Sequence, residues 1–169
     1  MIFRLVLLLF TLCAPTAAQA QYLWSTTANL CVPDATTTRF NRHNVGAASV
    51  QHAAGNVDLI VLNCPISPFN TDAHPSWFLR TSYQDSTGTN ATAFIRARLY
   101  RMASTESSPT LLVIANSNSL TDTGFGWMNK QFFHIFDFSN YTYWVRVELD
   151  RSTTSQVVIF YSLALYKGA

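Results

Sequence analysis

The sequence predicts one all-β domain, an antiparallel β-sandwich of about eight strands with a jelly-roll or Greek-key arrangement. Short runs in which apolar and polar residues alternate recur at intervals of about ten to fifteen residues. Turn-forming Gly, Pro, Asn and Asp residues separate these runs. After the first twenty residues, no segment combines helical spacing with capping residues. The pattern favours a sandwich, and a closed barrel is the alternative that it leaves open.

Residues 1–20 have the order of a secretory signal peptide. Arg4 gives a positively charged start, an apolar run follows over residues 5–14, and Ala18-Gln19-Ala20 is a small-residue cleavage site. The apolar run is too short to span a bilayer, which takes about 20 helical residues. We therefore expect a mature domain of residues 21–169 that has no transmembrane segment and is secreted, periplasmic or at the cell surface.

The charge of the mature chain is close to zero. The sequence has 11 Lys and Arg and 9 Asp and Glu residues, and Arg4 leaves with the leader, so the net charge becomes +1. Binding to nucleic acid needs clustered cations, and binding to acidic membrane surfaces needs a polybasic segment. The sequence therefore predicts neither partner. Residues 21–169 are enough for one domain with a hydrophobic core.

The alternating runs give the expected strands in chain order. They are residues 43–52 (a weaker candidate, softened by Gly46), 57–64, 77–83, 91–102, 110–115, 132–138, 141–149 and 156–166. The last two are expected to form a C-terminal antiparallel hairpin across the polar turn 150–155.

Successive side chains of a strand point to opposite faces, so each run predicts a buried and an exposed set. In strand 141–149 the buried set is Tyr141, Tyr143, Val145, Val147 and Leu149. In strand 91–102 it is Ala93, Ile95, Ala97 and Leu99. In strand 156–166 it is Val157, Ile159, Tyr161, Leu163 and Leu165.

Two cysteines remain after Cys13 leaves with the leader. Cys31 and Cys64 are an even count in an oxidising compartment, which predicts one disulfide. The alternative is a pair of free or metal-bound thiols, but zinc usually takes four ligands and no second cysteine pair exists. Pro33 and Pro65 follow the cysteines and favour extended backbone before them. We expect the bond to tie the N-terminal segment to the end of strand 57–64.

The same residues carry a family resemblance. Cys31-Val32-Pro33 and Asn63-Cys64-Pro65-Ile66, behind a signal peptide, resemble a group of short exported bacterial proteins with no assigned activity. The resemblance implies a small secreted domain. It supplies no functional residues.

Motifs for catalysis and cofactors are weak throughout. Asp122-Thr-Gly124 matches the loop of aspartic proteases, but a turn explains it as well. The segment Asp85–Asn90 has one carboxylate where calcium loops carry several, so we expect a hairpin turn. His43, His52, His74 and His134 lack metal-ligand spacing. We expect no cofactor, no metal site, no catalytic residues and no enzymatic activity.

Aromatic and arginine side chains on the exposed strand faces are the candidate binding residues. They are Trp144, Arg146, Tyr100, Arg96 and Arg98. Trp, Tyr and Arg concentrate at protein interfaces, so the favoured function is a structural or interaction module that contacts another protein or itself. The alternative is a carbohydrate-binding module in which rings stack on sugars, and a hydrolase with a site assembled in three dimensions is the third. Arg96 and Arg98 are also placed to pair with Glu148 across strands.

Overall fold

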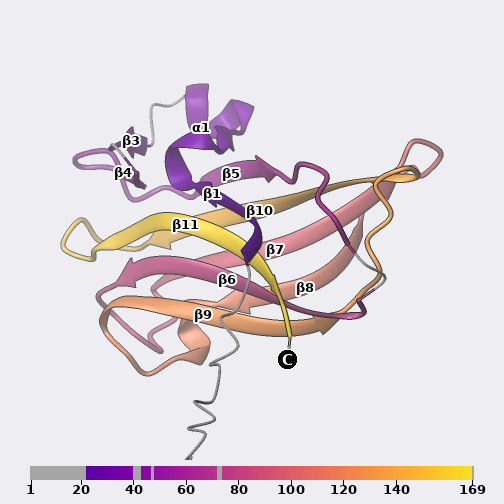
Figure 1. Cartoon of the computed structure of the whole chain (residues 1–169). Helices are drawn as coiled ribbons and strands as arrows, with labels where there is room; N and C mark the ends of the chain where they lie inside the picture. Colours follow the sequence, from indigo (N-terminus) through magenta and orange to yellow (C-terminus); the bar gives the residue numbers. More distant parts are fainter. Residues whose placement is uncertain (1–21, 40–42, 47, 72–73, 169) are drawn as a thin grey trace, which may run out of the picture.

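The computed structural model describes residues 22–39, 43–46, 48–71 and 74–168, and shows two antiparallel sheets packed face to face (Figure 1). The predicted β-sandwich is therefore confirmed. The predicted signal peptide, residues 1–20, lies outside the described residues. No described helix is long and apolar enough to cross a membrane.

Sheet A contains six strands and sheet B contains five. The strands of sheet A are β1 (Tyr22–Thr27), β3 (His43–Val45), β4 (Val50–His52), β6 (Ser76–Asp85), β9 (Gly124–Phe133) and β11 (Val158–Lys167). Those of sheet B are β2 (Val32–Pro33), β5 (Ile60–Pro65), β7 (Ala93–Ala103), β8 (Thr110–Asn116) and β10 (Tyr141–Arg151). The helical pieces are η1 (Ala28–Leu30), α1 (Ala35–Arg39) and η2 (Ser117–Ser119).

The strand order is that of a jelly roll. Sheet A runs β3-β4-β11-β6-β9, with β1 on β11, and sheet B runs β2-β5-β10-β7-β8. From β4 to β11, every connection except that between β7 and β8 crosses from one sheet to the other. β1, β2 and β3 are additions to this eight-stranded frame. They lie with α1 at one edge of the sandwich, while β8 and β9 form the other edge (Figure 1).

The core fills the space between the inner faces of the two sheets. The predicted inner set of β7 is fully buried, and that of β10 is buried from Tyr143 to Leu149, so both predictions are confirmed. An aromatic cluster closes one end of the core. In it, Trp77 and Tyr143 pack with Phe69, Phe136 and Phe138.

The predicted C-terminal hairpin is wrong. β10 lies in sheet B between β5 and β7, whereas β11 lies in sheet A and pairs with β1, β4 and β6. Both strands have one buried face, as their alternation indicates. In a sandwich each sheet buries one face, so alternation identifies the inward side chains of a strand but not its partner.

The predicted inner set of β11 is correct only in its second half. The pairing of β11 with β6 shifts register between Phe160 and Ser162, as a β-bulge does. One extra residue reverses the alternation. Val158 and Phe160 are therefore buried before the bulge, whereas the predicted residues Val157, Ile159 and Tyr161 are not.

The predicted strand 132–138 is displaced from the observed one. β9 ends at Phe133, and residues 134–137 continue without strand pairing. Phe136 and Phe138 pack on Tyr143 in the aromatic cluster, which accounts for the apolar character of the segment. The strand itself, Gly124–Phe133, begins eight residues before the predicted start.

The predicted disulfide is present. Cys31 is bonded to Cys64, with the two Cα atoms 4.3 Å apart. Cys64 lies in β5 and Cys31 directly precedes β2, which pairs with β5 through Val32 and Asn63. The bond therefore ties the N-terminal segment to the end of β5, as expected from the sequence.

Asp85 organises the turn after β6. Its Oδ1 accepts hydrogen bonds from the backbone nitrogen and the hydroxyl of Thr87, at 2.9 and 2.8 Å. Its Oδ2 accepts one from the hydroxyl of Ser117 at 2.6 Å, and the same hydroxyl accepts from the nitrogen of Ile95 at 3.0 Å. Asp85 is fully buried. This chain of bonds links sheet A to sheet B. Residues 85–90 form a turn, but the expected hairpin is wrong, because β6 lies in sheet A and β7 in sheet B.

His52, at the end of β4, is buried in its neutral form. Its Nε2 donates to the backbone oxygen of Asp58 at 3.0 Å, and no described atom bonds to Nδ1. Burial and the nearby charge of Arg151 lower the pKa of His52 from 6.5 to about 4. Between about pH 4 and pH 6.5, the unfolded chain therefore binds a proton at His52 and the folded chain does not.

Acidification is expected to destabilise the domain through His52. Because folding lowers the pKa of His52, the free energy of unfolding has its full value above pH 6.5 and decreases as the pH falls towards 4. The loss amounts to about 3 kcal/mol in the free energy of unfolding. Urea unfolding at several pH values measures it. His134, whose pKa burial also lowers, acts in the same direction, so the comparison is with His52→Gln. An unchanged pH slope in that variant contradicts the assignment.

Candidate functional site

The predicted aromatic residues meet on the outer face of sheet B. Trp144 and Tyr100 lie directly opposite each other on β10 and β7. Their rings are stacked, with centroids 5.5 Å apart and an angle of 21° between the ring planes. Both side chains are partly buried. Because each ring covers one face of the other, neither presents both faces to a ligand.

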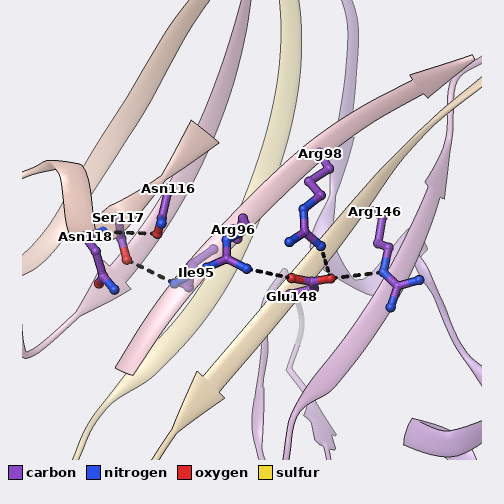
Figure 2. A network of polar contacts seen from close by, with 8 residues as sticks. All are labelled: Ile95, Arg96, Arg98, Asn116, Ser117, Asn118, Arg146 and Glu148. Carbon is purple, nitrogen blue, oxygen red and sulfur yellow. Dashed lines mark hydrogen bonds and ion pairs between the residues drawn. The ribbon is translucent and has the colours of Figure 1, made fainter. Parts of the chain in front are cut away.

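The predicted arginines surround Glu148 on the same face (Figure 2). Glu148 is only 5% exposed. Its Oε2 lies 3.5 Å from Arg96, and its Oε1 accepts from Arg98 and, at 3.2 Å, from Nε of Arg146. The predicted cross-strand pairing of Arg96 and Arg98 with Glu148 is therefore confirmed. The third partner, Arg146, is two residues earlier on the strand of Glu148.

The outer face of sheet A holds a second set of aromatic residues. β9 turns Phe125 and Trp127 towards solvent, where they are 58% and 57% exposed. The ring of Phe125 contacts Trp127 at 5.3 Å and Tyr161 of β11 at 5.5 Å, edge to face in both cases. These contacts hold the indole in place while much of its surface remains accessible.

A hollow of about 490 Å³ lies beside Trp127. Its floor consists of small side chains at adjoining register positions, Ser82 of β6 with Ser162 and Ala164 of β11. Ser82 is the direct partner of Trp127 across the strands. A row of small residues between large ones leaves a depression on an otherwise flat sheet. Its volume is within the usual range of small-ligand sites.

Arg80, two residues before Ser82 on β6, also lines the hollow. Its Nε donates to Oδ1 of Asn129 at 2.8 Å, and its Nη1 donates to the hydroxyl of Tyr22. The guanidinium also lies over the rings of Tyr22 and Tyr166, at 5.6 and 5.0 Å from their centroids. Hydrogen bonds and cation–π contacts together fix its orientation. A ligand in the hollow therefore meets a pre-positioned donor.

The groups that line the hollow can form hydrogen bonds and stack on apolar surfaces. The lining offers the hydroxyls of Ser25, Thr26 and Thr27 of β1, the guanidinium of Arg80 and the apolar face of Trp127. Such groups donate and accept hydrogen bonds and stack on flat apolar surfaces. No Asp, Glu, His or Cys occurs in the described lining. No three such residues gather into a metal-ligand group anywhere in the described ranges.

Trp127 and Arg80 were missed by the sequence interpretation. Trp127 lies outside the predicted strand 132–138, because β9, the strand that carries it, begins at Gly124. One signal was present. In Gly124-Phe-Gly-Trp127, aromatic residues alternate with glycines, which is the period of a strand whose large side chains all face one way.

Comparisons with known proteins give likenesses to solved structures alone. No protein-family model matches the chain, and no curated protein does. Among solved structures, the chain is similar to the carbohydrate-binding module TmCBM61, solved in complex with β-1,4-galactotriose. The TM-score is 0.43 and the sequence identity is 8%, over 88% of this chain and 92% of the other.

Proposed function

We propose that this chain is a secreted, non-catalytic carbohydrate-binding module, and that the sugar lies in the hollow over sheet A. The observation that carries the proposal is that an exposed indole, Trp127, and an oriented guanidinium, Arg80, line the same hollow together with small side chains. The indole face is suited to the apolar face of a sugar ring. Arg80 and the serine and threonine hydroxyls are suited to the sugar hydroxyls.

Binding without hydrolysis is proposed because glycoside hydrolysis generally uses a pair of carboxyl groups at the scissile bond. The described lining of the hollow offers none. The leader predicted from residues 1–20 and the disulfide between Cys31 and Cys64 both support an extracytoplasmic location.

Replacing the indole is expected to remove most of the affinity. A glycan array of neutral oligosaccharides identifies a ligand, and calorimetric titration then compares the wild-type protein with Trp127→Ala. We expect about a tenfold weakening, because one ring-stacking contact is lost. The matched control is Phe133→Ala, an aromatic residue on the same outer face of β9, 75% exposed and outside the lining of the hollow. Equal affinity in Trp127→Ala and wild type, or no glycan bound by the wild type, contradicts the proposal.

A protein-contact module is the second candidate, and one observation favours it. β9 is the edge strand of sheet A and exposes Phe125, Trp127 and Phe133 together. Edge strands with apolar side chains are prone to pair with another chain. Gel filtration separates the two candidates. A dimer that dissociates in Phe133→Ala supports this candidate, and a monomer that binds glycans supports the first.

A further inference from the structure

Two arginines face each other on the outer surface of sheet B, on the opposite side of the molecule from the hollow. Arg98 of β7 and Arg146 of β10 are direct cross-strand partners. Like charges in this position destabilise a sheet. Both guanidinium groups share one carboxylate oxygen, Oε1 of Glu148, and Arg96 takes the other. One carboxylate thus compensates three cations, and positive charge is left over.

The excess charge is greatest at the end of the cluster formed by Arg98 and Arg146. Asp150 follows Glu148 by two residues on the same face, near Arg96, and burial raises the pKa of Asp150. At the other end, the register neighbours of Arg146 and Arg98 are Asn63 of β5 and Ile114 of β8, which carry no charge.

Arg146 has binding capacity to spare. It contacts Glu148 through Nε, and in the described part of the chain its two terminal nitrogens have no hydrogen-bond partner. Figure 2 shows them directed away from Glu148. The side chain is 41% exposed, against 7% for Glu148. Glu148 therefore holds the guanidinium by one edge while the other edge faces solvent, which is the edge that binds a carboxylate or sulfate in a bidentate manner.

The stacked rings of Trp144 and Tyr100 lie beside the arginine pair. Trp144 precedes Arg146 by two residues, and Tyr100 follows Arg98 by two, so the stacked rings lie on the same face at the next register position. A ring bearing an anionic substituent finds apolar surface and paired cations side by side.

We infer that this face is an anion-binding site for an acidic polysaccharide, with a carboxylate or sulfate group held between Arg98 and Arg146. Glu148 acts as a positioning residue that keeps the guanidinium groups together. The site is separate from the hollow over sheet A, and it does not depend on sugar binding there.

Binding to charged polymers tests the inference. The probes are polygalacturonate for carboxylate, dextran sulfate for sulfate, and neutral dextran as a blank, each measured by affinity electrophoresis at low salt. We expect at least one anionic polymer to retard the protein and the neutral polymer not to. Arg146→Gln is expected to weaken binding about tenfold, the effect of losing charge-assisted hydrogen bonds. Arg146→Lys keeps the charge but not the planar fork, so a partial loss is expected.

Lys130→Gln is the matched control, since it removes the same charge from an exposed position on β9 of the other sheet. Less than about a twofold change is expected there, because a distant exposed charge is largely screened. Equal weakening in Arg146→Gln and Lys130→Gln, or no retardation by either anionic polymer, overturns the inference. Arg146→Gln is expected to bind neutral glycans with the affinity of the wild-type protein, whereas Trp127→Ala is expected to bind them more weakly. The two proposals therefore fail separately.

Discussion

Asp85→Ala is expected to lower the free energy of unfolding by about 3–5 kcal/mol, since three hydrogen bonds to a buried charged group are lost together. The Ser117 hydroxyl, 1% exposed, loses its acceptor, and Thr87 loses the group that orders its backbone nitrogen and hydroxyl. For a domain of this size the change corresponds to a melting temperature lower by about 10 °C. Thermal unfolding followed by circular dichroism measures it.

Two variants make the Asp85 result specific. Asp85→Asn keeps the shape and one acceptor oxygen but removes the charge, so an intermediate loss is expected. Asp122→Ala removes a carboxylate from an exposed loop position, where about 0.5 kcal/mol or less is expected. If Asp85→Ala and Asp122→Ala have the same melting temperature, the hydrogen-bond chain between the sheets contributes little to stability.

Loss of the disulfide is expected to have an effect of similar size. The bond closes a loop across a sequence separation of 33 residues, and chain entropy then predicts about 3–4 kcal/mol of stabilisation. The double variant Cys31→Ser with Cys64→Ser should therefore melt about 10 °C lower.

Reduction of the wild-type protein provides the control for the disulfide, because it breaks the bond without introducing buried hydroxyl groups. Comparable losses on reduction and on substitution attribute the effect to the bond. An unchanged melting temperature after reduction, with both thiols alkylated, shows that the bond does not stabilise the fold.

The sequence predicted features that depend on one strand and its two faces. The burial of Ile95, Leu99 and Val147 followed from alternation alone, because a half-buried strand must place every second side chain in the core. The disulfide followed from cysteine count and compartment. The ion pairs of Glu148 with Arg96 and Arg98 followed from opposite charges on the outer faces of two strands.

Features that depend on a partner or a local irregularity were not predicted. Nothing in the alternation of β10 and β11 distinguishes a hairpin from two strands in opposite sheets. The bulge near Tyr161 inserts one residue and reverses the inner set of β11, yet it has no sequence signal such as a glycine. Both errors arise from tertiary pairing, which a single strand does not encode.

The candidate site was missed for a reason that concerns function. Along β9, the outward positions carry Phe125 and Trp127, while Gly126 occupies an inward one between them. This reverses the usual order of apolar core and polar surface, so the alternation in this segment indicates the wrong buried face. Departures from the folding pattern are expected where a surface is kept for binding.

The place of β11 in the sheet also determines when the domain can fold. This last strand occupies an interior position of sheet A and pairs with β1, β4 and β6, so contacts of very long sequence separation complete the sheet. Such topologies have high contact order and fold slowly, because chain closure precedes any gain from pairing. A nascent chain that lacks β11 cannot complete sheet A. The native state of the domain is therefore reached only once β11 is available for pairing.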